Sequence, residues 1–223
     1  MAEATVQLNE SILGYEFTPD AQRKAPAVIV IHEVMGVVDY VKDVARSLSD
    51  KGFAALAVDL FEGKTAKGME DGRPLRDKVT EEVFKTKIDV GIRYLESRPY
   101  FSGKLGVIGF CMGGGFSLRT ACIFPQKINA CVVFYGRIDN LELLQSLRAP
   151  VLGNFGEEDK NITAWAVEIF RPTMERLGES LDMKVYPGAP HGFHRHTTPH
   201  VYRPEAAKDA FQRTLDFFDR TLK

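Results

Sequence analysis

The feature that most constrains the fold of this chain is a regular alternation between short apolar segments and longer segments with helical periodicity. The short segments are rich in β-branched residues, and they are Ala27–Ile31, Phe53–Val58, Leu105–Gly109, Ala130–Tyr135, Pro150–Phe155 and Met183–Tyr186. Their apolar residues form short continuous runs rather than alternating with polar ones, which is typical of strands that are covered on both faces. We therefore expect a buried sheet whose strands are separated by helices.

The helical segments fall between these strands and after the last one, at Tyr40–Ser49, Thr80–Ser97, Met112–Phe124, Asn140–Leu147, Ile162–Leu177 and Glu205–Leu222. Pro172 lies inside the fifth segment and predicts a break or kink there. The polar segment Gly63–Thr80 is expected to be a surface excursion. Strand–helix alternation predicts an α/β fold with a mostly parallel central sheet and helices on both faces, in a single domain over residues 1–223.

The composition excludes several classes of function. The chain has 29 Lys and Arg against 30 Asp and Glu, a net charge of −1, so it lacks the basic field that holds nucleic acid or an anionic membrane. No stretch approaches the ~18 apolar residues of a membrane span. The N-terminus carries acids and no apolar run, so we expect no signal peptide, and three cysteines do not indicate a disulfide framework. A cytoplasmic protein is expected, either a monomer or a small homo-oligomer.

One loop has the pattern of a catalytic nucleophile. Cys111 lies in the sequence Gly109-Phe110-Cys111-Met112-Gly113, directly after an apolar strand and before a helix. A turn this tight needs small flanking residues, and it displays the central side chain at the top of the sheet and at a helix N-terminus, where a thiolate is favoured. The backbone N–H groups of Met112 and Val34 are the expected oxyanion donors.

The alternative for Cys111 is a small buried apolar residue, but that role has no use for glycines on both sides. For the other two cysteines the structural role is the expected one. Cys122 lies in the middle of a helix and Cys131 lies in an apolar strand.

A thiol nucleophile needs an imidazole for its proton and a carboxylate that orients the imidazole. Asp159 follows the strand Pro150–Phe155, and His191 follows the strand Met183–Tyr186. Reactive groups of parallel sheets gather at the carboxyl ends of the strands, so these side chains are expected to meet Cys111. Glu157 and Glu158 are the alternatives to Asp159.

Further histidines follow His191, at positions 194 and 196, and raise the question of a metal site. Neither the H-E-x-x-H pattern nor a Cys/His zinc pattern is present. The GxGxxG and Walker patterns are also missing where they would be needed. The sequence therefore predicts neither a metal nor a cofactor, and a small-molecule substrate as the partner.

Four motifs in this order resemble those of the dienelactone hydrolases (carboxymethylenebutenolidases), a family with the α/β-hydrolase fold. The motifs are His32-Glu33-x-x-Gly36, Gly109-x-Cys111-x-Gly113-Gly114, Gly156-x-x-Asp159 and His191-Gly192-Phe193. The resemblance runs from about Ala25 to the C-terminal helix. It implies a triad of Cys111, His191 and Asp159.

The resemblance also implies roles for residues around the triad. Glu33 would accept a hydrogen bond from the resting thiol, and Arg195 would hold a carboxylate of the substrate. A second arginine belongs after the strand Phe53–Val58, where Arg73 and Arg76 are both candidates. Tyr135, at the end of its strand, would either line the pocket or belong to the core.

These residues lead to a hypothesis of function. We expect a hydrolase that cleaves a lactone or carboxylic ester bearing a carboxylate, through a thioester on Cys111. Two alternatives stay open at this point. One is a general carboxylesterase or thioesterase of the same fold, and the other is a non-catalytic, redox-sensing protein in which Cys111 is oxidised.

Overall fold

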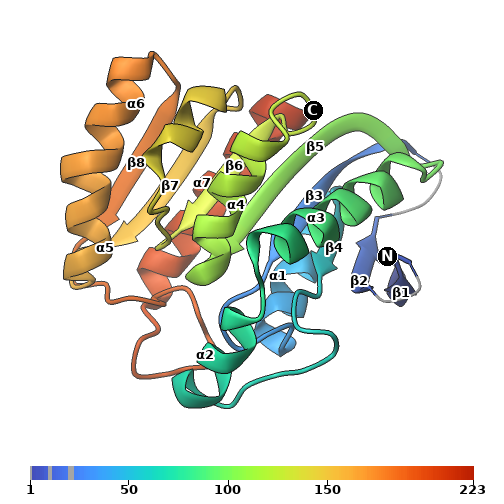
Figure 1. The fold of residues 1–223 in the computed structure, drawn as a ribbon, viewed down its shortest axis with the longest axis horizontal. Helices are drawn as coiled ribbons and strands as arrows, with labels where there is room; N and C mark the ends of the chain where they lie inside the picture. The colour runs from blue at the N-terminus through green and yellow to red at the C-terminus, as the bar shows by residue number, and fades with distance from the viewer. Residues whose placement is uncertain (1, 10–11, 20–22) are drawn as a thin grey trace.

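The computed structural model describes residues 2–9, 12–19 and 23–223, and its eight strands form one sheet in the order β1-β2-β4-β3-β5-β6-β7-β8 (Figure 1). The strands are β1 Ala2–Gln7, β2 Leu13–Thr18, β3 Ala25–Ile31, β4 Ala54–Val58, β5 Phe101–Phe110, β6 Ala130–Phe134, β7 Val151–Gly156 and β8 Leu181–Tyr186. The six strands β3 to β8 are parallel to one another, whereas β2 pairs antiparallel with both β1 and β4.

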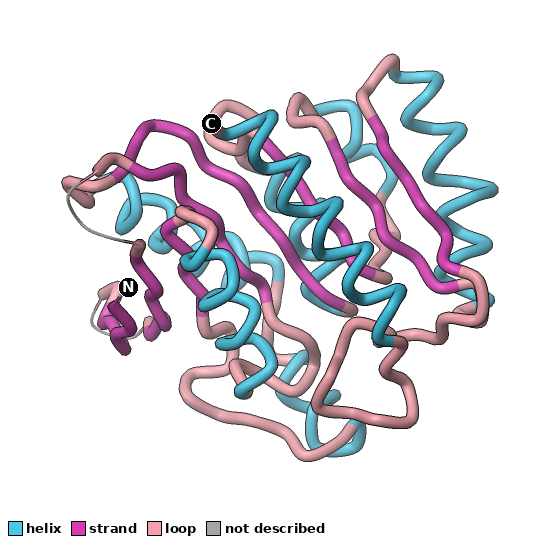
Figure 2. The backbone as a smooth tube through the Cα atoms, turned by 180° about the vertical axis from the view of Figure 1, so that it is seen from behind, coloured by secondary structure: helices cyan, strands magenta, loops and turns pink. Residues whose placement is uncertain are grey.

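Helices cover both faces of the sheet. They are α1 Asp39–Asp50, α2 Met69–Asp77, α3 Glu81–Glu96, α4 Met112–Ile123, α5 Lys160–Trp165, α6 Arg171–Leu177 and α7 Pro204–Leu222. Figure 1 shows α3, α4 and α6 in front of the sheet, and Figure 2, from behind, shows α1 and α7 across the opposite face. This is the α/β-hydrolase architecture, with the mostly parallel sheet that the alternation of segments predicted.

The two faces of the sheet explain why its strands are continuously apolar. In β3, Ile29 and Ile31 belong to the core that contains α3 and α4, whereas Val28 and Val30 belong to the core that contains α1 and α7. Successive side chains of a strand point to opposite faces. A strand covered on both faces therefore needs an apolar residue at every position.

The N-terminal strands were not predicted. Nearly every residue of β1 is exposed, and β2 is only partly buried, so neither has the continuous apolar run by which the other six strands were recognised. The segment Gly63–Thr80 was predicted only as a surface excursion, and it contains α2. Gly72 is the one buried residue of that helix, so the sequence carries no apolar stripe to reveal it.

Two of the predicted helices differ in detail. Ile162–Leu177 is helical throughout, but α5 and α6 are joined by a turn of π-helix, Ala166–Phe170, and Pro172 lies in the first turn of α6. The interruption expected from Pro172 thus takes the form of a wider helical turn just before it. Asn140–Leu147 contains a short 3₁₀-helix, Leu141–Ser146, rather than an α-helix.

None of the helices in the described ranges combines the length and the apolar character that a bilayer crossing demands.

Candidate active site

The turn from β5 to α4 holds Cys111 in a backbone conformation that residues other than glycine rarely adopt. Its φ is 55° and its ψ is −117°. Strain of this kind costs on the order of 1–3 kcal/mol and persists where the surroundings enforce it. The N–H of Cys111 donates to the carbonyl of Phe134 at 3.0 Å, and the N–H of Gly114 donates to the carbonyl of Cys111 at 3.0 Å. These bonds fix the turn around the thiol.

The flanking glycines are required by the packing of the backbone. A Cβ atom on Gly109 would overlap the carbonyl of Gly113, and a Cβ atom on Gly113 would overlap the carbonyl of Ile31 in the neighbouring strand. Because those neighbours are backbone atoms of buried elements, they have no room to give way. The steric reason for glycines on both sides of Cys111 is therefore present in the structure.

Asp159 and His191 lie at the carboxyl ends of β7 and β8, as their positions in the sequence predicted. The imidazole Nδ1 of His191 is 2.5 Å from Oδ2 of Asp159. The carboxylate is nearly buried, whereas the imidazole side chain is 42% exposed. Asp159 thus holds the imidazole by one nitrogen and leaves the other ring edge open to the cavity.

The surroundings of His191 favour its protonated form. Burial lowers its pKa, but hydrogen bonds to Asp159 and to the Cys111 thiol outweigh that effect and raise the pKa to about 10. The interaction with the thiol also places the imidazole within reach of the sulfur. Thus Cys111, His191 and Asp159 form a connected series, although they come from three separate loops.

The two alternative acids have other contacts. An Oε atom of Glu157 accepts a hydrogen bond from the N–H of Gly188 at 3.0 Å. Glu158 is 3.8 Å from the guanidinium of Arg203. Neither contact involves His191, so of the three consecutive acids it is Asp159 that meets the imidazole.

A cavity of about 440 Å³ opens beside the thiol. Among the residues that line it are five predicted for the site, namely Cys111, His191, Met112, Val34 and Tyr135. Within the described residues, the N–H groups of Val34 and Met112 have no hydrogen-bond acceptor. Two unpaired donors at the edge of a cavity, next to a nucleophile, are what an oxyanion hole requires.

Glu33 lies at the end of β3, where it is buried and paired with Arg195. Its Oε2 is 3.4 Å from the Nε of Arg195, yet neither atom forms a hydrogen bond with any described residue. Burial raises the pKa of Glu33, while the positive charges of Arg195 and His191 oppose that rise. The family resemblance placed Glu33 against the thiol. In the described structure the carboxylate of Glu33 forms no hydrogen bond with Cys111 or with any other described residue. Its ion-pair partner is Arg195.

The two candidates for the second arginine differ in position. Both are exposed residues of α2, but Arg76 lines the cavity and Arg73 does not. Arg76 also donates two hydrogen bonds to Asp77, at 2.8 and 2.6 Å. Arg195 does not line the cavity; its side chain is 23% exposed, and it faces the more deeply buried Glu33.

Two further arginines line the cavity and were missed from the sequence. Arg119 lies two helical turns after Cys111 on α4, and Arg137 follows β6 two residues after Tyr135. Both positions obey rules that could have revealed them, since residues i and i+8 share a helix face and β6 ends at the same sheet edge as β5. With Arg76 they bring three guanidinium groups to the cavity wall, where each is paired with a carboxylate: Arg76 with Asp77, Arg119 with Glu81 and Arg137 with Asp139.

Tyr135 is buried in the core and lines the cavity as well, so both roles left open by the sequence apply. Its φ is 39°, a second strained residue next to the nucleophile. Its ring lies edge-on to His191, with the ring centroids 5.1 Å apart. Burial, followed by the nearby charge of Glu33, raises the pKa of its hydroxyl well above the usual value.

The remaining cysteines and histidines lie apart from this cavity. Cys122 and Cys131 are buried, and burial raises the pKa of both thiols, as expected of structural residues. His194 contacts Tyr40, and His196 contacts Asp43. Among the described residues, no group of three or more His, Cys, Asp or Glu side chains is placed to hold a metal ion.

Comparison with known proteins agrees with this geometry. The family model described as "Dienelactone hydrolase family" matches residues 12–222. A Bradyrhizobium protein named "Probable 2-oxo-3-(5-oxofuran-2-ylidene)propanoate lactonase" is 31% identical over 221 residues, covering 92% of this chain and 88% of that protein. A crystal structure of "Putative Dienelactone Hydrolase" from Klebsiella pneumoniae is 27% identical, covers 98% of both chains and superposes with a TM-score of 0.88.

A second solved structure, dienelactone hydrolase from Anabaena variabilis, is similar in fold, with a TM-score of 0.76 at 22% identity, covering 100% of this chain and 99% of that one. The fold, with Cys111 on a strand-to-helix turn at the carboxyl end of a mostly parallel sheet, defines an α/β-hydrolase. Within that class, the chain belongs to the dienelactone hydrolase family. It is accordingly a hydrolase of carboxylic esters or lactones.

Proposed function

We propose that this chain hydrolyses lactones or activated esters that bear a carboxylate, and that it does so through a thioester on Cys111. One observation carries the proposal. Cys111 is held at a positive φ on the wall of a cavity, next to an imidazole whose other side is bonded to Asp159. A nucleophile, a base and a residue that orients the base are the parts that acyl transfer needs.

In the first half of the reaction, the sulfur of Cys111 attacks the carbonyl carbon while the proton of the thiol resides on His191. The π electrons of the carbonyl move to its oxygen, which accepts hydrogen bonds from the N–H groups of Val34 and Met112. When the carbonyl re-forms, the bond to the leaving oxygen breaks and that oxygen takes the proton from His191. A lactone would open in this step, leaving the acyl group on sulfur.

In the second half, a water molecule attacks the thioester and transfers a proton to His191. The bond between carbon and sulfur then breaks, the acid leaves, and Cys111 regains the proton. Asp159 stabilises the imidazolium that forms in both halves, which is consistent with the raised pKa of His191. No oxidant or reductant is needed, since each step is a substitution at an acyl carbon.

Recognition of a substrate carboxylate is supported by the charge of the cavity wall. Arg76, Arg119 and Arg137 line it, and their ion pairs with Asp77, Glu81 and Asp139 are of the exposed kind for which a substrate carboxylate can compete. Three guanidinium groups are thus gathered at the cavity, although the chain as a whole carries a net charge of −1. Such a concentration attracts anions and raises their local concentration.

Glu33 and Arg195 give this recognition a means of sensing the substrate. The Oε2 of Glu33 and the Nε of Arg195 are both buried and have no hydrogen bond between them. A substrate carboxylate that approached Arg195 would compete with Glu33 for the guanidinium, for which a bidentate carboxylate is a better partner. The displaced Glu33 would then leave the proton of the thiol to His191, the order of events that the family resemblance implies.

The test is a panel of matched esters and lactones, each made with and without a carboxylate, assayed on the wild type, Cys111→Ala and Arg195→Ala. We expect Cys111→Ala to lose turnover of every substrate. We expect Arg195→Ala to lower kcat/KM about 30-fold for the carboxylate-bearing members, the usual effect of a charge-assisted hydrogen bond, and to leave the neutral members within about threefold. Turnover that survives in Cys111→Ala would refute the thioester route.

The second candidate is a general carboxylesterase or thioesterase that makes no use of a substrate carboxylate. It is favoured by the engagement of Arg195 with Glu33 and by the position of Arg195 outside the cavity lining. This candidate predicts equal losses for charged and neutral substrates in Arg195→Ala. The same panel therefore decides between the two.

A further inference from the structure

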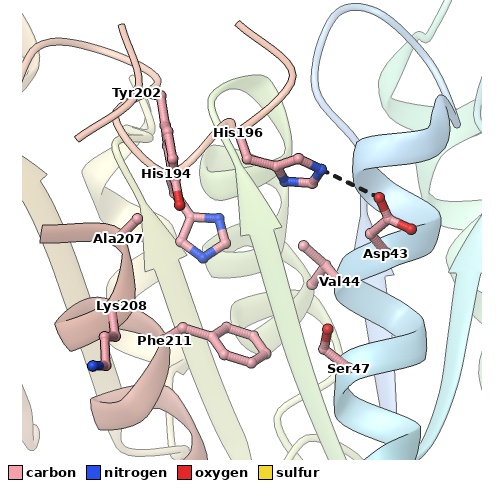
Figure 3. Close-up of a pocket in the computed structure, with 9 residues that line it drawn as sticks. All are labelled: Asp43, Val44, Ser47, His194, His196, Tyr202, Ala207, Lys208 and Phe211. Carbon is pink, nitrogen blue, oxygen red and sulfur yellow. Dashed lines mark ion pairs between the residues drawn. The ribbon is translucent and has the colours of Figure 1, made fainter. Parts of the chain in front are cut away.

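A second cavity lies between α1 and α7, on the face of the sheet that these two helices cover. Its volume is about 240 Å³. Val44 of α1 and Ala207 and Phe211 of α7 give it an apolar wall, and His194, from the loop after β8, stands between the two helices (Figure 3). We call it the outer cavity. None of the residues that line it lines the catalytic cavity.

The polar groups of the outer cavity are not engaged by the rest of the protein. The hydroxyls of Ser47 and Tyr202 and the ammonium of Lys208 have no hydrogen-bond or ion-pair partner among the described residues. The Nε2 atom of His194 likewise has no such partner there. A few unengaged polar groups that converge on an apolar wall are the usual composition of a small-molecule site.

The charges around the outer cavity favour an anion. The one carboxylate of its lining, on Asp43, is already paired with Arg46 at 2.6 Å and with His196 at 3.2 Å. Lys208 is left without a carboxylate partner at the rim, where Figure 3 shows its ammonium turned away from His194. An anionic ligand would therefore meet hydroxyl donors, with the ammonium of Lys208 as an unpaired cation nearby, and its apolar part would pack on Phe211.

His194 can serve as either donor or acceptor to such a ligand because it is neutral. Burial, with a smaller contribution from the neighbouring His196, lowers its pKa to about 3. A neutral imidazole carries its hydrogen on one nitrogen and accepts with the other. Which nitrogen carries the hydrogen thus depends on the partners of the ring.

Two tyrosines connect His194 to the catalytic cavity. The Nδ1 atom of His194 is 2.8 Å from the hydroxyl of Tyr40, and that hydroxyl is 3.4 Å from the hydroxyl of Tyr135. Each hydroxyl has one hydrogen to donate, so the hydrogen bonds that link His194, Tyr40 and Tyr135 all have their donors on the same side. If Nε2 carries the hydrogen, Nδ1 accepts from Tyr40, and Tyr40 in turn accepts from Tyr135.

We infer that the outer cavity binds a small aromatic carboxylate, and that its occupation is transmitted to the catalytic cavity through His194, Tyr40 and Tyr135. A carboxylate accepts hydrogen bonds only, so it fixes the hydrogen of His194 on Nε2. The hydrogen of Tyr135 is then directed to Tyr40 and away from the substrate. The ligand changes which way a hydrogen bond points at the catalytic cavity, without reaching that cavity.

Benzoate is the probe, and calorimetry is the first measurement, since it needs no enzymatic activity. We expect benzoate to bind to the wild type and to Arg195→Ala with the same affinity. Ser47→Leu, which fills the outer cavity from α1, should weaken binding at least tenfold, whereas Ser47→Ala, which removes the hydroxyl but leaves the space, should weaken it about threefold. Binding that survives Ser47→Leu and is lost in Arg195→Ala would assign benzoate to the catalytic side and overturn the inference.

The transmission is tested separately by kinetics and by ¹⁵N NMR of the histidines. Benzoate should convert His194 to the form with hydrogen on Nε2, and should lower kcat/KM for a neutral ester severalfold to a plateau, because the enzyme with benzoate bound still turns over. In Tyr40→Phe, benzoate should still bind, but the plateau should equal the rate without benzoate. Inhibition that falls to zero with rising benzoate, or that persists in Tyr40→Phe, would refute the transmission. Because binding is read without substrate, failure of the proposed lactone hydrolysis would leave this test intact.

Discussion

Two carboxylates sit next to cations near Cys111, and they are held very differently. Asp159 contacts the imidazole of His191 at 2.5 Å. Glu33 lies 3.4 Å from the guanidinium of Arg195, and neither of the facing atoms forms a hydrogen bond with a described residue. In the first pair the imidazole of His191 lines the cavity, whereas neither member of the second pair does.

The difference separates fixed parts of the site from exchangeable ones. A carboxylate that is already hydrogen-bonded to the imidazole needs no rearrangement during the reaction, which is the condition for preorganised catalysis. Buried polar atoms without a hydrogen bond raise the free energy of the folded protein, and a ligand that supplies the missing hydrogen bond lowers it. We therefore assign Asp159 to the chemistry and Glu33 to the response to substrate, and each assignment can be broken by substitution.

The largest effect is expected from Asp159→Asn. The amide keeps the size of the side chain but no longer stabilises the imidazolium and favours the wrong tautomer of His191, which costs ~10⁴ in kcat in a comparable triad. KM should stay within about threefold, because Asp159 does not touch the substrate. Steady-state kinetics on a neutral ester provides the measurement, with circular dichroism as the check on folding. A loss of less than tenfold would mean that His191 is oriented by something else.

Glu33→Gln should change KM rather than kcat. If Glu33 competes with the substrate carboxylate for Arg195, removal of its charge should lower KM for a carboxylate-bearing ester, by about three- to tenfold for one such ionic contact. KM for the matching neutral ester should not change, and this ester is the control. Equal changes for both esters would show that Glu33 is part of the fixed machinery, and the contrast with Asp159 would disappear.

The same contrast shows what the sequence could reveal. Cys111, Asp159 and His191 were predictable because each follows a recognisable buried strand, and the carboxyl ends of parallel strands meet at one edge of the sheet. The pairing of Glu33 with Arg195 was not predictable, since it depends on how two loops pack. Arg119 and Arg137 carry no motif, and they enter the site through the orientation of α4 and the end of β6.

The fold was predictable to the same extent and for the same reason. All six predicted strands are present. Five of them lie inside the sheet, and their apolar runs are buried, whereas β8 is an edge strand in which Asp182 and Lys184 are exposed. The β1–β2 hairpin and α2 bury too few side chains for their sequences to show a continuous apolar run or an apolar stripe. For α2 the omission matters, because that helix brings Arg76 to the cavity.

A smaller effect is expected on stability as the pH changes. The folded protein raises the pKa of His191 from 6.5 to about 10. Protonated His191 therefore stabilises the fold fully below about pH 6.5, and this contribution is lost as the pH rises towards 10. Since the imidazole is 42% exposed, the contribution is about 1 kcal/mol after allowance for solvent screening.

Urea unfolding of the wild type and of Asp159→Asn at pH 6 and pH 10 measures this contribution. The free energies of unfolding should differ by about 1 kcal/mol at pH 6 and converge at pH 10. A difference that is equal at both pH values would show that Asp159 stabilises the fold by some contact other than the one with His191.

The smallest effect is expected from Glu158→Gln, one residue away from the most sensitive position. Glu158 is 3.8 Å from Arg203, and both side chains are largely exposed, so this ion pair contributes between 0 and about 0.5 kcal/mol. Turnover should remain within about twofold of the wild type, because the side chain contacts neither His191 nor the cavity lining. The measurement is the ester assay used for Asp159→Asn. A loss in Glu158→Gln approaching that of Asp159→Asn would mean that the acidic loop acts through its total charge, and that the 2.5 Å contact of Asp159 is not what sets it apart.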